Sequence, residues 1–167
     1  MTDFRPLKLR GQDAEDMAVI AACLQDAVVP VEDMVFRPGT EHAPGEFVMV
    51  AQRFRWEMLG PDEKPVEGDR YERVLCGVTF SGVHRARLSG IDRRRDRDGL
   101  LNLLTLVATE EQGAARIDLV FAGDKAIRLE VARAAAEAWI AHWQSQAALV
   151  LLEALREESA RAVATAE

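Results

Sequence analysis

The chain has 167 residues, of which 49% are hydrophobic and 29% are charged, a composition typical of globular proteins rather than of disordered or membrane-spanning chains. A chain of this length usually forms one domain, so we predict a single domain over residues 1–167. Its 28 acidic residues outnumber the 21 Lys and Arg residues, and the net charge of −7 disfavours nucleic acid and anionic membranes as partners.

No feature of the sequence predicts export. Pro6 and scattered charges stand where a secretory signal needs a continuous apolar stretch, and no apolar run approaches the roughly 20 residues that span a bilayer. Cys23 and Cys76 fall in a helical and a strand pattern, which does not indicate a disulfide framework. We therefore expect a cytoplasmic protein.

The first predicted element is a short amphipathic helix over about residues 13–25. Asp13 can cap its N-terminus, and the acidic residues that follow complement the helix dipole. Met17, Ile20 and Leu24 then recur at intervals of three and four residues, as one face of a helix requires.

A β-rich body is predicted over residues 27–131, where β-branched and large apolar residues alternate with loops rich in Pro, Gly or charge. Its strands are expected over residues 28–36, 46–57, 71–83 with a bend at Gly82 into 84–88, 100–109, 117–121 and 127–131. Residues 100–109 are apolar on both faces, which predicts a central strand buried on both sides.

The last two strands are predicted to form a hairpin. For their apolar faces to lie on the same side of the sheet, Phe121 would pair with Ile127 and Leu119 with Leu129. The loop then holds an odd number of residues, three or five, with Gly123 at positive φ.

Residues 132–158 predict a long C-terminal helix because they consist largely of strong helix formers. Trp139, Trp143, Val150 and Leu151 lie on one stripe of this helix. A helix continuous from Ala132 to about residue 156 would be roughly 38 Å long, longer than a small sheet can cover, so its far end needs a second partner. Self-association through this helix is the resulting hypothesis.

In outline these elements predict an α+β fold, with a mostly antiparallel sheet or barrel of six or seven strands between a short N-terminal and a long C-terminal helix. Such an arrangement is similar to pleckstrin-homology-like barrels, and a more generic α+β sandwich is the alternative.

The sequence predicts no catalytic residue, cofactor or metal, and favours a non-catalytic protein over an enzyme. His42, His84 and His142 fall in a loop, a strand and a helix, without metal-ligand spacing. The four arginines of residues 92–98 alternate with three aspartates, which favours a solvated loop over a nucleic-acid site.

The leading functional hypothesis is a protein-interaction or adaptor module that binds a protein partner or a second copy of itself. Arginine and aromatic residues mix in Arg53-Phe54-Arg55-Trp56-Glu57, a composition typical of interface hot spots, with the two aromatics on one face and the two arginines on the other. The alternative is a structural role, in which the two aromatics lie in the core and the two arginines face water. The candidate contact residues are Arg53, Arg55, Trp56, Trp143, Val150 and Leu151. The second hypothesis is a small-molecule-binding protein or enzyme in which Arg53, Arg55, Glu57 and His84 converge.

Several segments together resemble an uncharacterised bacterial family, domain-of-unknown-function family 2948. The resemblance spans roughly residues 7–131 and is carried by Asp13-Ala14-Glu15-Asp16, Leu24-Gln25-Asp26-Ala27-Val28-Val29, Arg53-Phe54-Arg55-Trp56-Glu57 and the hairpin from Phe121 to Val131. It implies no activity, and it leaves the segment after Val131 as the part least like the family.

Overall fold

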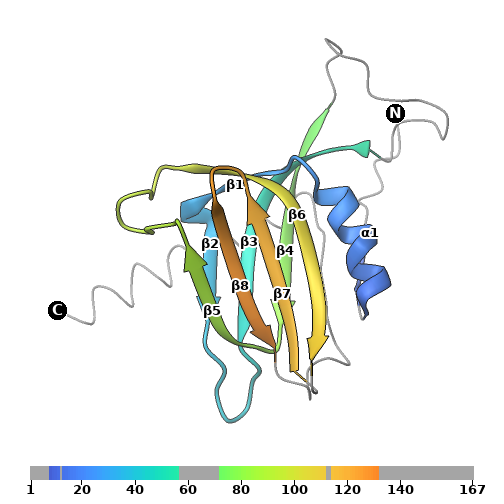
Figure 1. The fold of residues 1–167 in the computed structure, drawn as a ribbon, viewed down its shortest axis with the longest axis vertical. Helices are drawn as coiled ribbons and strands as arrows, with labels where there is room; N and C mark the ends of the chain where they lie inside the picture. The colour runs from blue at the N-terminus through green and yellow to red at the C-terminus, as the bar shows by residue number, and fades with distance from the viewer. Residues whose placement is uncertain (1–7, 12, 57–71, 112–113, 132–167) are drawn as a thin grey trace.

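A computed structural model describes residues 8–11, 13–56, 72–111 and 114–131 of the chain. Their elements in chain order are α1 (Ala14–Leu24), β1 (Val28–Pro30), the 3-10 turn η1 (Val31–Asp33), β2 (Met34–Arg37), β3 (Glu46–Phe54), β4 (Arg73–Ser81), β5 (Val83–Ser89), β6 (Leu100–Glu111), β7 (Ala114–Phe121) and β8 (Lys125–Val131) (Figure 1). With 11 residues α1 is too short to cross a bilayer, and the described ranges contain no other α-helix.

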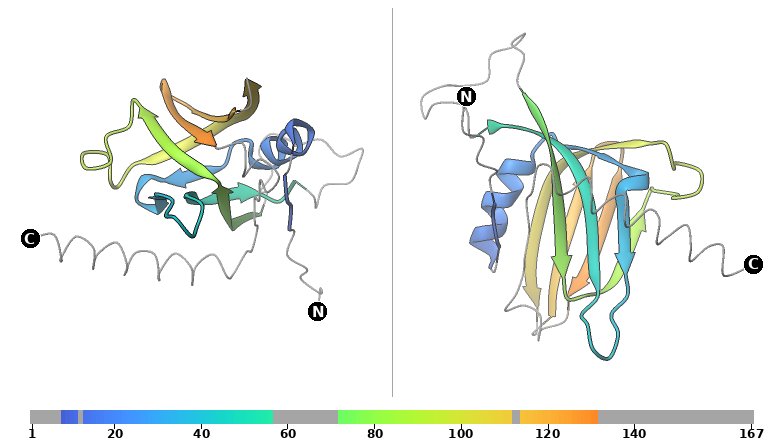
Figure 2. Two further views of the ribbon diagram at one scale, coloured as in Figure 1. Left: turned by 90° about the horizontal axis from the view of Figure 1, so that it is seen from below. Right: turned by 180° about the vertical axis from the view of Figure 1, so that it is seen from behind.

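The strands form one antiparallel sheet in the order β2-β3-β1-β6-β7-β8-β5, and β4 pairs with the other edge of β3. β4 leads into β5 through Gly82, whose φ of 78° lets the chain bend sharply. The sheet therefore curls into a nearly closed barrel with two layers, β2-β3-β4 behind and β5-β8-β7-β6 in front (Figures 1 and 2). β1 links the layers because Val28 pairs with both Gln52 and Asn102.

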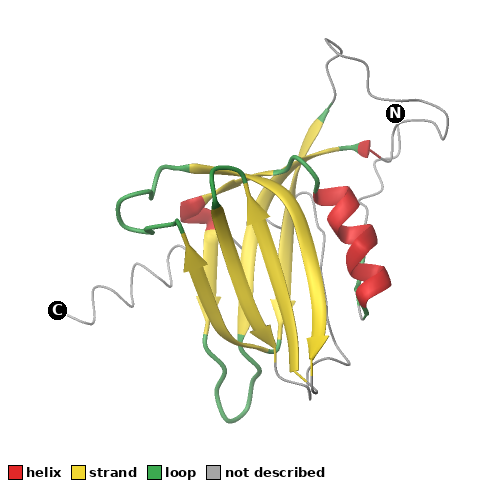
Figure 3. Cartoon of the chain, viewed as in Figure 1, coloured by secondary structure: helices red, strands yellow, loops and turns green. Residues whose placement is uncertain are grey.

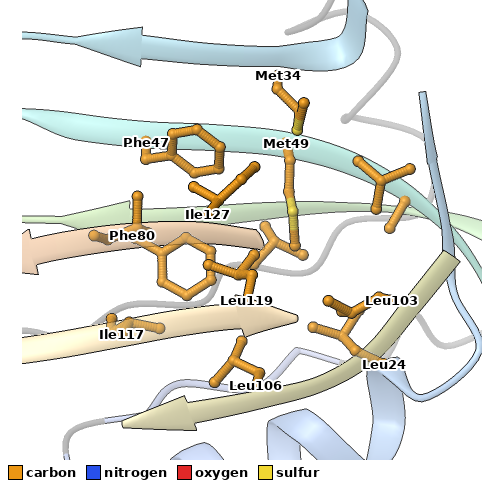
Figure 4. Packing of buried hydrophobic residues seen from close by; sticks show 14 of the residues in the cluster. Leu24, Met34, Phe47, Met49, Phe80, Leu103, Leu106, Ile117, Leu119 and Ile127 are labelled. Carbon is orange, nitrogen blue, oxygen red and sulfur yellow. The ribbon is translucent and has the colours of Figure 1, made fainter. Parts of the chain in front are cut away.

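The core fills the space between the two layers. Phe47, Met49 and Phe80 of the back layer face side chains of the front layer, among them Leu119 and Ile127 (Figure 4). α1 lies beside β6 and adds its own buried face, formed by Met17, Ile20 and Leu24. The alternating side chains of the front strands point outward, away from this core.

The predicted N-terminal helix is confirmed. Asp13 is its N-cap, and the Asp13 carboxylate accepts a hydrogen bond of 2.9 Å from the backbone N–H of Asp16. This contact satisfies one of the backbone donors that a helix N-terminus leaves free.

The predicted balance of helix and strand was wrong. Eight strands and one short helix make the described chain predominantly β (Figure 3), rather than an α+β fold of six or seven strands with a long C-terminal helix. The predicted helix over residues 132–158 lies outside the described residues. One additional strand arises because η1 divides the predicted segment 28–36 into β1 and β2. At this point the Val31 N–H donates to the Gly99 carbonyl at 2.9 Å. The chain then leaves β6, with which β1 pairs, and β2 pairs with β3.

The hairpin of β7 and β8 has an odd number of loop residues, as predicted, but its strands pair in a different register. Phe121 pairs with Lys125 and Leu119 with Ile127, across a loop of three residues. The prediction was two residues off, and a shift of two leaves every side chain on its own face. Gly123 has a φ of 76°, as predicted, and Asp124 also has a positive φ, of 56°.

The prediction that β6 is buried on both faces was wrong. This strand occupies a central position in the sheet order, yet only its inner side is buried, since Leu104 and Val107 are 48% and 44% exposed. The outer face of the front layer is therefore open to solvent at these residues.

Candidate interaction surface

Charged side chains gather on the outer face of β5, β8 and β7. They occupy the strand positions that alternate with buried residues such as Ile117, Leu119 and Leu129, so the pleat of the strands turns them outward. We call the set Arg85, Arg87, Arg116, Asp118, Arg128 and Glu130 the basic face. It lies on the layer nearest the viewer in Figure 1.

The sheet register determines which of these charges meet. Arg116 lies directly opposite Glu130, and Asp118 lies opposite Arg128. Arg87 lies opposite Arg128, a like-charge pair that is unfavourable by itself. The two carboxylates between the arginines offset this repulsion.

Asp118 joins two of the arginines. The Arg128 Nε donates to Asp118 Oδ1 at 2.7 Å, and this hydrogen bond raises the pKa of Arg128 above its ordinary value. The Arg116 Nε lies 3.1 Å from Asp118 Oδ2 but is not aligned for a hydrogen bond. Both guanidinium groups thus turn toward the same carboxylate.

Glu130 joins the charges of β5. The Arg87 Nε lies 2.9 Å from Glu130 Oε1, and the His84 Nε2 lies 3.6 Å from Glu130 Oε2. His84 reaches Glu130 because the β5 register shifts between Val83 and Arg85, which places one extra residue against β8. Arg85 makes no ion pair within the described ranges.

The basic face therefore carries four arginines against two carboxylates, an excess of two positive charges on a chain whose net charge is −7. Two exposed apolar side chains lie at its border on β6: Val107 is opposite Asp118, and Leu104 is nearby on the same strand. Exposed apolar side chains beside a charged surface are typical of places where proteins bind one another.

A pocket of about 270 Å³ lies at one end of this face. It is formed where β6 and β8 end and β5 and β7 begin, and its lining residues are His84, Thr109, Ala114, Ala115, Arg116, Arg128 and Glu130. The Thr109 Oγ1 on its wall is buried and has no hydrogen-bond partner.

The structure separates the two arginines that the sequence analysis grouped. Arg53 is buried at 2% exposure, on the same side of β3 as Met49 and Ala51, and its Nη1 donates to the Phe54 carbonyl at 2.8 Å. The alternative with both arginines in water is therefore wrong for Arg53. The Arg55 Nη1 forms an ion pair of 2.6 Å with Glu72.

The aromatics of this segment do share a side. The rings of Phe54 and Trp56 lie 4.9 Å apart, and the Arg73 guanidinium covers the Phe54 ring at 3.9 Å. Glu72 and Arg73 were not identified from the sequence because they follow 17 and 19 residues after Arg55 and Phe54 and meet them only through the pairing of β3 with β4.

The grouping of Arg53 with His84 does not form. The Val83 N–H donates to the Gly45 carbonyl, so His84 lies near the start of β3, whereas Arg53 lies near its end. The nine residues of β3 are separated by eight steps of about 3.3 Å, which place its ends about 26 Å apart. Glu57, Trp143, Val150 and Leu151 lie outside the described residues.

The arginine-rich loop between β5 and β6 is internally bonded. Asp92 Oδ1 accepts from the backbone N–H groups of Arg94 and Arg95, at 2.9 and 3.1 Å. Arg93 reaches across to donate to the Met34 carbonyl at 2.6 Å. These contacts hold the loop together, and most of its charged residues are exposed, as predicted for a solvated loop.

Comparison with known proteins identifies a family but no activity. No curated protein and no solved structure matches the chain. Residues 7–147 match the family described as "Protein of unknown function (DUF2948)", so the match continues 16 residues beyond the resemblance predicted from the sequence. Because this match covers most of its length, the chain belongs to the DUF2948 family.

Proposed function

We propose that the chain is a non-catalytic interaction module that binds an acidic segment of a partner protein on its basic face. One observation carries the proposal: two excess positive charges and the exposed Leu104 and Val107 lie together on the surface of an otherwise acidic chain. Complementary charge guides the encounter between proteins, and apolar contacts beside it supply affinity.

A protein partner fits this surface better than a nucleic acid or an anionic membrane. Two excess charges are few against a polyanion, and the net charge of −7 repels one at longer range. The described aromatic side chains lie in the core or near the end of β3, so the basic face has none on which a base could stack.

A cytoplasmic partner is part of the proposal. Neither Cys23 nor Cys76 forms a disulfide in the described part of the chain, and thiols stay reduced most readily in the cytoplasm. A second copy of the chain also offers acidic surface, so the oligomeric state belongs among the measurements.

The test compares Arg85→Glu with Arg94→Glu. Both substitutions change the net charge equally, but Arg85 lies on the basic face and Arg94 in the loop between β5 and β6. Proteins that the wild-type chain captures from cell extract are identified and purified. Calorimetric titration then measures the affinity of each for the wild type and for the two variants, and light scattering measures self-association.

We expect an acidic partner, or a second copy, whose affinity falls about tenfold or more with Arg85→Glu and less than about twofold with Arg94→Glu. If each partner binds wild type and Arg85→Glu equally, or if the purified partner binds through a basic segment, the proposal is wrong.

A further inference from the structure

The pocket at the end of the basic face has the size of a small ligand's binding site. Its volume of about 270 Å³ corresponds to roughly nine water molecules at about 30 Å³ each. Its hollow shape follows in part from sequence, because the exposed Ala114 places only a methyl group where β7 begins. Larger side chains there would fill it.

Hydrogen-bond donors on its wall exceed the acceptors that the described chain provides. Arg116 and Arg128 both turn Nε toward Asp118, and their terminal amino groups make no hydrogen bond within the described ranges. Each guanidinium has four N–H bonds on those terminal groups. Two guanidinium groups side by side match the oxygens of a phosphate or carboxylate.

Thr109 points to the same kind of ligand. Its register partner is Arg116, and its buried hydroxyl lacks a hydrogen-bond partner in the described chain. A buried polar group without a partner is unfavourable, and an oxyanion in the pocket would accept a hydrogen bond from the Thr109 hydroxyl.

Glu130 also lines the pocket, and its charge opposes an anion. The Arg87 Nε lies 2.9 Å from Glu130 Oε1 and offsets that charge, and the His84 Nε2 lies 3.6 Å from Glu130 Oε2. The terminal N–H groups of Arg116 and Arg128, free within the described chain, outnumber what the two oxygens of a carboxylate accept, and the three terminal oxygens of a phosphate monoester match them better. We infer that this pocket binds the phosphate group of a small molecule between Arg116, Arg128 and Thr109. The inference does not rest on protein docking.

The experiment titrates the ¹⁵N-labelled full chain with inorganic phosphate, O-phosphoserine and acetate, each at an ionic strength held constant with sodium chloride. Saturable shifts of the Thr109, Ala115 and Arg128 amides, stronger with phosphate than with acetate, are expected. O-Phosphoserine binding more tightly than inorganic phosphate would identify a monoester as the natural ligand.

The decisive variant is Thr109→Val, which keeps the side-chain shape and removes the hydroxyl. It should weaken phosphate binding about fivefold and leave the melting temperature equal or higher, because the unpartnered hydroxyl disappears. A merely structural hydroxyl would instead lower the melting temperature and leave the affinity unchanged.

Controls separate this site from the docking surface. Arg116→Gln should abolish saturation, and Arg94→Gln should retain it. Arg85→Glu, which impairs the proposed docking, should still show saturable phosphate binding because Arg85 does not line the pocket. The inference would be overturned by amide shifts equal to those in sodium chloride alone or located away from the pocket. A preference for acetate, or a phosphate affinity unchanged by Thr109→Val, would overturn it as well.

Discussion

At the scale of single residues, Arg53 and Arg55 show how position decides what an arginine does. They are two residues apart, and the sequence treats them alike. Arg53 is 2% exposed and hydrogen-bonded within the chain, whereas the Arg55 side chain is 16% exposed and its ion-pair partner, the Glu72 side chain, is 64% exposed. Buried arginines stabilise a protein by filling space and satisfying polar groups, while solvated ion pairs contribute little.

Arg53→Ala should therefore be much more destabilising than Arg55→Ala. We expect Arg53→Ala to lower the free energy of unfolding by about 2–4 kcal/mol, through the cavity and the lost hydrogen bond to the Phe54 carbonyl. Arg55→Ala should cost about 1 kcal/mol or less. Urea unfolding of both variants measures the difference, and equal losses would contradict a buried structural role for Arg53.

At the scale of elements, the loop between β5 and β6 depends on two ionised carboxylates. Backbone hydrogen bonds from Arg95 and Arg94 hold the pKa of Asp92 below its ordinary 3.8, and the backbone N–H of Asp92 does the same for Asp96. A carboxyl whose pKa is lowered by folding stabilises the fold above its unfolded pKa, and this stabilisation disappears as the pH falls through the folded value.

The loop should thus keep its structure from pH 7 to about pH 4 and lose it below. The amide protons of Arg94 and Arg95 report on this, because both bond to Asp92 Oδ1. Chemical shifts and hydrogen exchange followed from pH 7 to 2 should show their protection lost only at the acid end. Asp92→Asn should weaken this pH dependence, and a transition of the wild-type loop above pH 5 would contradict the assignment.

The helix and strand positions were predictable from sequence where neighbouring residues determine them, and less so where they depend on pairing between residues far apart in the chain. The Asp13 cap and the apolar spacing of Met17, Ile20 and Leu24 are local, and they located α1 within one residue at each end. The register of β7 on β8 was missed because alternation repeats every two residues, so it cannot distinguish a loop of three from one of five. The basic face was missed because its arginines come from three strands and meet only in the folded sheet.

At the scale of the whole molecule, the two faces of the barrel's front layer have different roles. The inner face holds the core, with Leu119 and Ile127 fully buried. The outer face carries the basic face, its apolar border and the pocket. Sequence pattern alone assigned both faces of β6 to the interior, because exposed and buried valines and leucines look the same in a sequence.

Leu119→Ala and Val107→Ala should separate these two roles. Leu119 is 0% exposed, and its truncation should lower the free energy of unfolding by about 2–5 kcal/mol through loss of burial and an internal cavity. Val107 is 44% exposed on the adjacent strand, so its truncation should change stability by less than about 0.5 kcal/mol while weakening the docking of an acidic partner. Urea unfolding and the calorimetric titration, run on both variants, give the two readouts. A large stability loss in Val107→Ala would mean that this side of β6 serves the fold, and the proposed docking surface would then lose its apolar border.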